Sequence, residues 1–193
     1  TLNITDANNC NKLITIAIDE PTPLAQQVNI STSDYTGYNI GCKGDNSGWV
    51  AINITGGYIP YSFLWSNGSD SDSISDLYAG NYSVTLTDGL GCTSDFSLTL
   101  NEPPTHVSGV LNATSDYNGY EVSCYGEDNG SVEVIANGGV SGYTYNWSNG
   151  YNNSILTGIS AGYYEVLVYD NNSCLWIDSI TLNQPDSLQL SLI

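Results

Sequence analysis

The chain repeats itself with a period of 82 residues, and this period constrains the fold more than any other feature. Three sets of residues recur at that spacing without a gap: Cys10, Cys92 and Cys174; Cys42 and Cys124; Trp65 and Trp147. Self-similarity at a fixed period indicates an array of stacked modules rather than one large domain. We therefore divide the chain into four parts: the C-terminal hairpin of a preceding repeat (1–21), two whole β-sandwich repeats (22–103 and 104–185) and the start of a following repeat (186–193). We expect the parent chain to continue in both directions.

Within a repeat the apolar residues alternate with a period of two. Residues 48–55 and 130–137 show this alternation, and each segment ends at a Gly-Gly turn. No segment has a helical period. The pattern predicts about seven short strands per repeat, those of the first repeat including 24–31, 35–41 and 73–77. Such strands with Gly-rich turns indicate an all-β fold of tandem immunoglobulin-like antiparallel β-sandwich repeats.

Two aromatic features support this fold class. Residues 77–82 and 159–164 resemble the corner before the penultimate strand of immunoglobulin-like sandwiches, where a Tyr hydroxyl bonds back to the backbone. Trp65 and Trp147 are then the core tryptophans of the third strand. We expect both features to be structural.

The charge of the chain excludes several classes of partner. The 193 residues include two Lys, no Arg and 20 acidic residues, which gives a net charge of −18 at pH 7. Such a chain cannot neutralise a phosphate backbone, so we expect no nucleic-acid partner. No apolar run approaches the roughly 20 residues of a membrane helix, so we expect no membrane insertion. The 40% of hydrophobic residues are enough for a folded core.

The cysteines allow two self-consistent pairings. We favour Cys42–Cys92 with Cys124–Cys174, because each bridge then closes one small sandwich and constrains its unfolded chain by roughly 4 kcal/mol. The rival scheme pairs Cys10 with Cys42 and Cys92 with Cys124, and would link neighbouring repeats. Either scheme implies an oxidising compartment.

Catalysis is not expected. The chain has no Arg, and its one histidine, His106, aligns with Leu24 and Leu188 in the other copies. A catalytic Cys therefore has no recurring His partner, and the general acid–base groups are almost all carboxylates. We predict that the protein is not an enzyme and needs no cofactor.

The recurring carboxylates predict a calcium site, because this ion selects hard oxygen ligands. The candidate ligands recur in two Gly-containing loops and beside two cysteines: Asp45, Asn46, Asp88, Glu127, Asp128 and Asp170. The alternative is that these side chains form Asx-type turns and solvated charges.

Two further signals concern sugars. Asp-Ser-apolar strings place Ser73, Ser179 and Ser187 as candidate O-glycosylation sites. The chain also has 15 Tyr, which either stack on sugars or form cross-strand pairs on a sheet face.

An ordered set of motifs resembles the SprB repeat of giant surface adhesins from gliding Bacteroidota. In the first repeat these are Cys42-Lys-Gly-Asp-Asn-Ser-Gly48, Gly56-Gly57, Pro60-Tyr61, Trp65-Ser-Asn-Gly68, Leu77-Tyr-Ala-Gly-Asn-Tyr82 and Asp88-Gly-Leu-Gly-Cys92. The second repeat keeps most of them but has Gly142 in place of Pro60. The resemblance implies an extracellular, cell-surface filament protein that is exported by type IX secretion and driven along the cell surface in gliding motility.

We therefore expect a non-catalytic repeat segment of a long secreted adhesin that acts as a spacer and in multivalent adhesion. Its expected partners are external surfaces or polysaccharides, adjacent repeats of the same chain, and the secretion and gliding machinery. The alternatives are an array of carbohydrate-binding modules, or accessory repeats of a secreted enzyme. Residues 1–21 form only a hairpin, which is marginal alone in water, so we expect it to pack on the following repeat or on another molecule.

Overall fold

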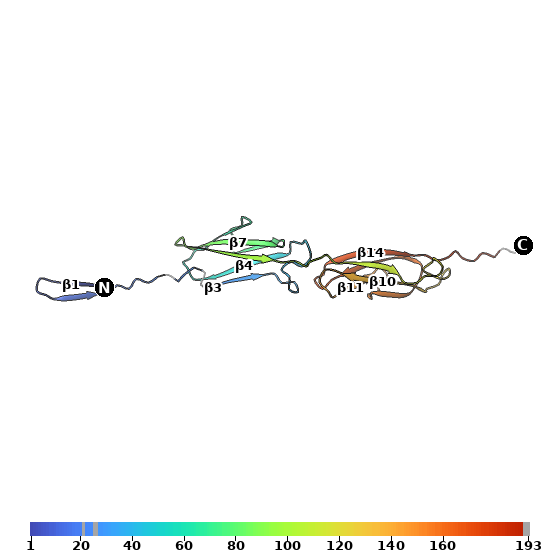
Figure 1. The fold of residues 1–193 in the computed structure, drawn as a ribbon, viewed down its shortest axis with the longest axis horizontal. Helices are drawn as coiled ribbons and strands as arrows, with labels where there is room; N and C mark the ends of the chain where they lie inside the picture. Colours follow the sequence, from blue (N-terminus) through green and yellow to red (C-terminus); the bar gives the residue numbers. More distant parts are fainter. Residues whose placement is uncertain (21, 25–26, 191–193) are drawn as a thin grey trace. The chain divides into compact units, whose positions relative to one another are not determined.

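The computed structural model describes residues 1–20, 22–24 and 27–190, and this part of the chain is all-β (Figure 1). It contains no helix, and hence no helix long and apolar enough to cross a membrane. The prediction of an all-β fold is confirmed.

A short hairpin precedes two sets of strands that follow the 82-residue period. The hairpin consists of β1 (Leu2–Thr5) and β2 (Asn11–Ile14). The first set is β3 (Gln27–Thr32), β4 (Gly48–Thr55), β5 (Ser62–Trp65), β6 (Ser73–Leu77), β7 (Gly80–Thr87) and β8 (Thr93–Leu100). The second set is β9 (Ser108–Ala113), β10 (Gly130–Asn137), β11 (Thr144–Trp147), β12 (Ile155–Ile159), β13 (Gly162–Tyr169) and β14 (Leu175–Leu182).

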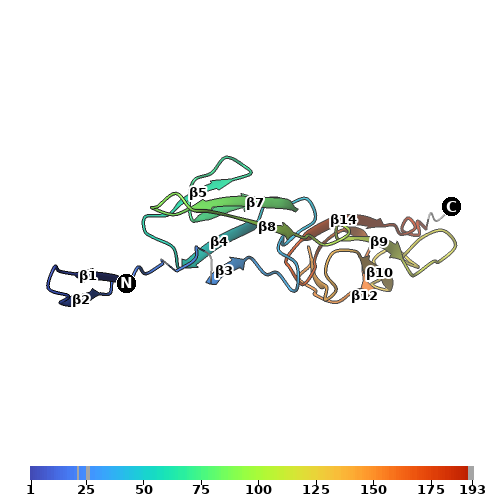
Figure 2. The same ribbon diagram turned by 60° about the vertical axis from the view of Figure 1, so that its left-hand side comes forward.

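Both sets pair in the same order. Strands β3, β4 and β6 form one three-stranded sheet, and β5, β7 and β8 form another; the second set repeats this as β9-β10-β12 and β11-β13-β14 (Figure 2). Strand β4 pairs antiparallel with β6 and β5 with β7, and in the second set β10 pairs antiparallel with β9 and β12, and β13 with β11 and β14. Immunoglobulin sandwiches divide their strands in a related way, with the first, second, fourth and fifth on one sheet and the third, sixth and seventh on the other.

Each described set has six strands, whereas about seven per repeat were expected. The predicted strand at 35–41 is wrong, because this segment folds into a tight turn. Tyr35 and Tyr38 form an isolated antiparallel bridge, and the carboxylate of Asp34 accepts the N–H of Gly37 at 2.9 Å. Thr36 and Gly37 have positive φ angles of 51° and 88°, which no extended strand contains. Part of the strand expected at 24–31 falls on residues 25–26, outside the described part, and β3 begins at Gln27.

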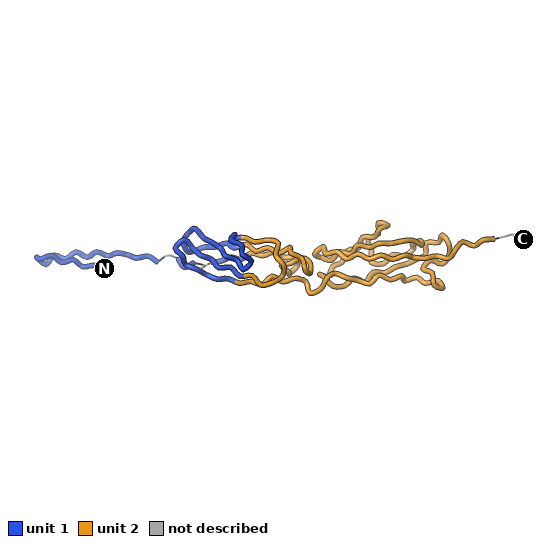
Figure 3. Tube along the Cα trace, turned by 90° about the horizontal axis from the view of Figure 1, so that it is seen from above, with its two compact units in different colours: residues 1–30, 52–72, 83–96 blue, residues 31–51, 73–82, 97–193 orange. Residues whose placement is uncertain are grey.

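Packing divides the chain into two compact units (Figure 3). Unit 1 comprises 1–30, 52–72 and 83–96, and unit 2 comprises 31–51, 73–82 and 97–193. These limits cut through strands and differ from the expected domain boundaries, which stay predictions; residue 21 and residues 191–193, at two of those boundaries, lie outside the described residues.

Unit 1 contains the hairpin and part of the first strand set. Trp65 is 2% exposed, and its indole N–H donates to the carbonyl of Ser71 at 2.8 Å. The ring is therefore buried while its one polar group keeps a hydrogen-bond partner. The hairpin lies outside this packing: residues 1–20 are exposed except for the half-buried Ile14. The expectation that the hairpin packs on the following repeat is therefore wrong for the described residues, and packing on another molecule stays a prediction.

Unit 2 contains the whole second strand set and its core. Val132, Val166 and Val168 are completely buried, and Trp147 lies in the same cluster at 4% exposure. Each fully buried aliphatic side chain of this kind stabilises the fold by about 1.5–3 kcal/mol. The Tyr corner also forms as expected: the hydroxyl of Tyr164 donates to the carbonyl of Ser160 at 2.9 Å, as Tyr82 does to Tyr78 at 3.0 Å.

Candidate functional site: the junction at Cys42 and Cys174

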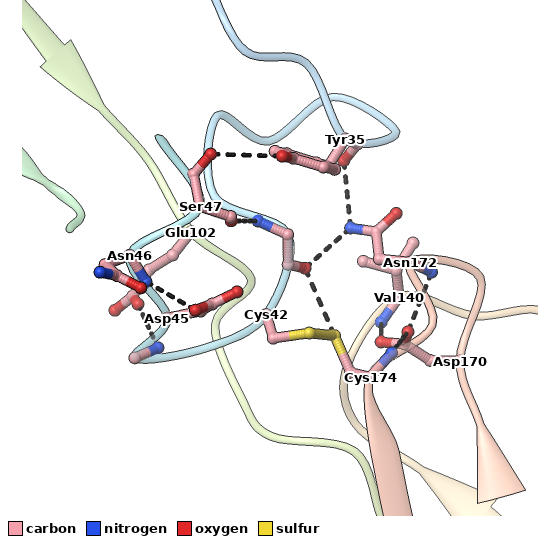
Figure 4. The surroundings of a disulfide bond; sticks show 12 residues. Tyr35, Cys42, Asp45, Asn46, Ser47, Glu102, Val140, Asp170, Asn172 and Cys174 are labelled. Carbon is pink, nitrogen blue, oxygen red and sulfur yellow. Dashed lines mark hydrogen bonds between the residues drawn. A yellow bond between two sulfur atoms is a disulfide. The ribbon is translucent and has the colours of Figure 1, made fainter. Parts of the chain in front are cut away.

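A disulfide joins Cys42 to Cys174 within unit 2 (Figure 4). The two Cα atoms are 5.6 Å apart and the residues are separated by 132 positions in the chain. Cys10, Cys92 and Cys124 are free and exposed. This pairing corrects both expected schemes, because it joins a turn of one repeat to a turn of the next.

The geometry of the second repeat explains why the favoured pairing fails. Cys124 lies just before β10, close to the end of the sheet where Gly130 pairs with Ile159. Cys174 lies beyond the opposite end of β13, where Tyr169 pairs with Leu175. The eight residues of β13 span roughly 26 Å, whereas a disulfide requires Cα atoms about 4.4–6.8 Å apart. Two cysteines at opposite ends of one sandwich cannot bond to each other.

Cys42 belongs to a turn that is held by backbone and side-chain hydrogen bonds. We call residues 35–47 the Cys42 corner. The N–H of Asp45 donates to the carbonyl of Cys42 at 3.1 Å, and the hydroxyl oxygen of Ser47 accepts the N–H of Gly41 at 2.9 Å. The hydroxyl of Tyr35 donates to the carbonyl of Ser47 at 3.2 Å. These bonds fix the position of Cys42 and of the neighbouring carbonyl of Gly41.

An ion pair reinforces the Cys42 corner. The ammonium group of Lys43 contacts the carboxylate of Glu102, and the other carboxylate oxygen of Glu102 accepts the N–H of Gly44 at 2.6 Å. The hydrogen bond from Lys43 and that from Gly44 outweigh partial burial and lower the pKa of Glu102. Glu102 is therefore ionised at neutral pH and ties the corner to the chain that leads into the second repeat.

Cys174 belongs to a second kind of turn, which is built around the buried carboxylate of Asp170. One oxygen of Asp170 accepts the N–H groups of Asn172 and Cys174, each at 2.9 Å, and the other accepts the N–H of Val140 at 2.8 Å. The N–H of Asp170 donates to the carbonyl of Cys174 at 3.0 Å. We call residues 170–174 the Cys174 hub.

Hydrogen bonds accompany the disulfide across the junction. The side-chain amide of Asn172 donates to the carbonyl of Gly41 at 2.9 Å and to that of Tyr35 at 3.2 Å (Figure 4). The neighbouring amide of Asn171 donates to the hydroxyl of Thr36 at 3.4 Å. Cys174 is only 8% exposed as a result.

Sequence reasoning missed Asn172 as a junction residue. A signal was present in the spacing: Asp6, Asp88 and Asp170 each stand four residues before a cysteine, and all three form the same backbone bonds. The spacing indicates a recurring turn, but it does not say what that turn contacts.

The chain between the repeats is fitted closely to the second sandwich. The N–H of Gly139 donates to the carbonyl of Thr105 at 3.2 Å, and Val107 is 7% exposed. Gly138 has a φ of +72°, and a Cβ there would lie 2.1 Å from the carbonyl oxygen of His106. Only glycine fits this approach.

The candidate calcium ligands are not brought together. The described residues contain no group of three or more His, Cys, Asp or Glu side chains placed for a metal ion. Asp45 accepts the N–H of Asn46 at 2.7 Å, while Asn46, Glu127 and Asp128 are exposed. Asp88 and Asp170 are buried and hold backbone N–H groups instead.

The two buried aspartates accept backbone hydrogen bonds in their turns, and for Asp88 these bonds lower the pKa. Burial raises the pKa of Asp88, but hydrogen bonds from the N–H groups of Cys92, Tyr58 and Leu90 outweigh that effect, so the pKa lies below its ordinary value. Calcium binding stays a prediction, with these bonds favouring the turn interpretation.

The candidate glycosylation sites lie at different depths. Ser73 and Ser179 are exposed on β6 and β14, whereas Ser187 is half-buried and its hydroxyl oxygen accepts a bond from the Gln189 amide at 3.0 Å. Their modification stays a prediction.

Comparison with solved structures finds proteins with immunoglobulin domains. One is the N-terminal eight Ig domains of Down Syndrome Cell Adhesion Molecule isoform 1.30.30, at 14% identity and a TM-score of 0.35 over 82% of this chain and 25% of that one. The amphioxus IgVJ-C2 molecule is 15% identical with a TM-score of 0.32, over 72% of this chain and 98% of that one. Murine CEACAM1b is 14% identical with a TM-score of 0.33, over 82% of this chain and all of that one. This chain thus spans a quarter of the first of these structures.

The comparison with protein families is more informative. No curated protein matches the chain. The SprB repeat matches residues 38–70 and 121–152, which include most of the Cys42 corner and of its counterpart around Cys124. The resemblance drawn from the sequence motifs is confirmed in the sense that two regions of the chain match the SprB repeat, one in each 82-residue period.

Proposed function

We propose that this chain is a non-catalytic spacer segment of a long, secreted, cell-surface adhesin filament. The observation that carries the proposal is the Cys42–Cys174 disulfide, which fastens one repeat to the next. A module that is fastened to the next module by a disulfide serves reach rather than turnover. The match to the SprB repeat supports the same conclusion.

The disulfide has a mechanical consequence. Tension on the two chain ends passes through the bond from Cys42 to Cys174, so the 132 residues between them cannot be pulled straight. A fully extended chain spans about 3.3–3.6 Å per residue, so the bond withholds roughly 450 Å of extension. A filament that is dragged over a surface benefits from repeats that do not unravel.

Repetition provides reach and avidity. Strands of eight residues span about 26 Å, so each repeat with its loops adds roughly 30–40 Å to a filament. Weak contacts with external surfaces or polysaccharides add up along such an array. The net charge of −18 keeps neighbouring filaments apart.

The proposed setting is extracellular. A disulfide between repeats forms and persists in an oxidising compartment. Within this proposal, type IX secretion exports the filament and the gliding machinery moves it, and both expectations rest on the family resemblance. O-glycans at the exposed Ser73 and Ser179 are a further expectation of the same proposal.

Force spectroscopy on the chain, held by its two ends, tests the spacer role. We expect the oxidised chain to release only the length outside the Cys42–Cys174 loop, and the reduced chain to release about 450 Å more. Equal lengths before and after reduction would refute the mechanical role.

A glycan-binding screen separates the spacer from a carbohydrate-binding module. We expect no sugar to bind more tightly than about 1 mM. Tighter binding that is lost in Tyr125→Ala or Tyr163→Ala, two exposed tyrosines, would favour the alternative function.

A further inference from the structure

The turn around Cys124 repeats the main hydrogen bonds of the Cys42 corner but not its ion pair. The hydroxyl of Tyr117 donates to the carbonyl of Asn129 at 3.3 Å, and the side-chain oxygen of Asn129 accepts the N–H of Ser123 at 3.0 Å. The side-chain oxygen of Gln184 accepts the N–H of Gly126 at 2.9 Å, in the role of Glu102. We call residues 117–129 the Cys124 corner. It has the shape that the Cys174 hub recognises in the first repeat.

The Cys124 corner differs from the Cys42 corner in exposure. Gly41 is buried and Cys42 and Tyr35 are half-buried, because the Cys174 hub covers them. In the Cys124 corner the tyrosines at the equivalent positions are 39% and 40% exposed, and Tyr125 beside the cysteine is 64% exposed: these are Tyr117, Tyr120 and Tyr125. Cys124 itself is a free, exposed thiol.

A hollow marks the uncovered place. It has a volume of about 340 Å³ and is lined by Cys124, Tyr125, Pro185 and their neighbours. The corresponding hollow at the Cys42 corner is smaller, about 120 Å³, and Gly139, Cys174 and Leu175 of the second sandwich line its other side. The established junction therefore shows what fills such a hollow.

The first repeat carries the matching hub in an uncovered form. One oxygen of Asp88 accepts the N–H groups of Leu90 and Cys92 at 3.0 and 2.9 Å, and the other accepts the N–H of Tyr58 at 3.1 Å. This is the bonding of the Cys174 hub, yet Cys92 is a free, exposed thiol and Leu90 is 58% exposed. The chain thus carries one closed junction and both halves of another.

We propose that the Cys124 corner is a docking surface for the Asp-x-x-x-Cys hub of another copy of this repeat. The occupant is a further repeat and not a free ligand, because the Cys42 corner binds such a hub in this same chain. The inference rests on the proposed role as a tandem spacer and names the partner of its surface.

A disulfide completes the docking. Two thiols, Cys124 and the hub cysteine of the next repeat, lose two protons and two electrons to a disulfide oxidant. The oxidant's sulfur–sulfur bond breaks, and it leaves as two thiols.

In a long array, the disulfides of successive junctions would form overlapping loops. Each disulfide joins cysteines that are 132 residues apart, which is one 82-residue period more than the 50 residues from Cys42 to Cys92. The loop that one disulfide closes therefore overlaps the loop closed by the next disulfide along the array. Because Cys124 lies inside the loop closed by Cys42 and Cys174, no repeat of a fully oxidised array extends independently of its neighbours.

An extended chain tests the proposal. A copy of residues 104–185 is inserted after residue 185, with Leu175→Val in the copy as a mass label, and the protein is oxidised in a glutathione buffer. We expect peptide mapping without reduction to join Cys124 to the labelled hub peptide, beside the Cys42–Cys174 bond. Cys124→Ser should abolish the labelled link and release one free thiol, whereas the matched control Cys10→Ser should leave the link unchanged.

Two results with the extended chain overturn the proposal. One is a Cys124 thiol that stays alkylatable while Cys42–Cys174 forms, and the other is a bond from Cys124 to any cysteine outside a hub. Oxidation of the unmodified 193-residue chain at high concentration in the same buffer is a second experiment. We expect it to give a covalent dimer in which Cys124 of one copy is bonded to Cys92 of the other. Absence of both products overturns the proposal even if the extended chain fails to fold. The spacer function could survive that outcome, because force spectroscopy on the Cys42–Cys174 loop tests it separately.

Discussion

The side-chain amide of Asn172 donates a hydrogen bond to the carbonyl of Gly41 at 2.9 Å, across 131 residues of chain. The same amide reaches the carbonyl of Tyr35 at 3.2 Å. The junction between the two repeats is therefore held by directional bonds as well as by its disulfide. Leu90 occupies the equivalent position in the first repeat, and its side chain cannot make these bonds although the two turns agree.

Asn172→Leu should loosen the junction. Two hydrogen bonds are lost, each worth about 1 kcal/mol, and the carbonyl of Gly41 loses its amide partner in a buried setting. We expect reduction of the Cys42–Cys174 bond by dithiothreitol to become roughly tenfold faster, measured by timed alkylation. Asn171→Ala removes only the 3.4 Å contact to Thr36 and should change the rate little; equal rates for both variants would contradict the role of Asn172.

Asp170→Ala should destabilise the second repeat. The change removes an acceptor of three backbone N–H groups at a position only 4% exposed. Leaving such donors unsatisfied costs about 1–3 kcal/mol each, so we expect a loss of roughly 3–5 kcal/mol in urea denaturation. Asp6→Ala is the matched control, because Asp6 holds Asn8 and Cys10 in the same way on an exposed hairpin. A loss below about 1 kcal/mol for Asp170→Ala would show that the hub is not structural.

Gly138→Ala should be more harmful than an ordinary turn substitution. The added Cβ would lie 2.1 Å from the carbonyl oxygen of His106, in addition to the strain of a φ of +72°. We expect a loss of more than about 3 kcal/mol, against about 1 kcal/mol for Gly150→Ala, which has a similar φ and open space around it. Thermal melting of the two variants measures the difference. Similar melting temperatures would mean that the chain between the repeats is not fitted to the second sandwich.

Acidification should weaken the fold in a defined window. The pKa values of Glu102 and Asp88 are both lowered in the folded chain, so each contributes stability that is fully present above its unfolded pKa of about 4 and is lost as the pH falls through its lower folded pKa. We expect the free energy of unfolding to fall as the pH drops below about 4. Urea denaturation between neutral pH and pH 2 measures this dependence.

Glu102→Gln supplies the control for that experiment. Gln184 makes the equivalent backbone bond to Gly126 in the second repeat, so the variant should keep the bond to Gly44 while it loses the ion pair with Lys43. The pH dependence should become shallower. An unchanged slope would mean that Glu102 does not contribute to acid sensitivity.

Chelation of calcium should leave the melting temperature unchanged. Asp88 and Asp170, the two buried members of the candidate set, already accept backbone N–H groups with their carboxylate oxygens. A drop of several degrees on addition of EGTA, restored by excess calcium, would instead support the metal prediction made from the loops.

The expectations that succeeded depend on local patterns. Alternation over 48–55 and 130–137 corresponds to β4 and β10, and the Tyr corners and core tryptophans lie where their motifs placed them. The strand expected at 35–41 failed because Asp34 and Gly37 form a turn whose backbone bonds outweigh the β propensity of two tyrosines.

By itself the sequence determined the repeat and most of the strands, because the repeat recurs at a fixed spacing and a strand leaves an alternating pattern in neighbouring residues. The choice of Cys174 as the partner of Cys42 was decided only by the tertiary structure. An eight-residue strand separates the two cysteines of one sandwich, which lie at its opposite ends. The Cys174 hub of the next repeat lies against the Cys42 corner, with the Cα atoms of Cys42 and Cys174 5.6 Å apart. Spacing along the chain contains no information about which ends of two sandwiches meet.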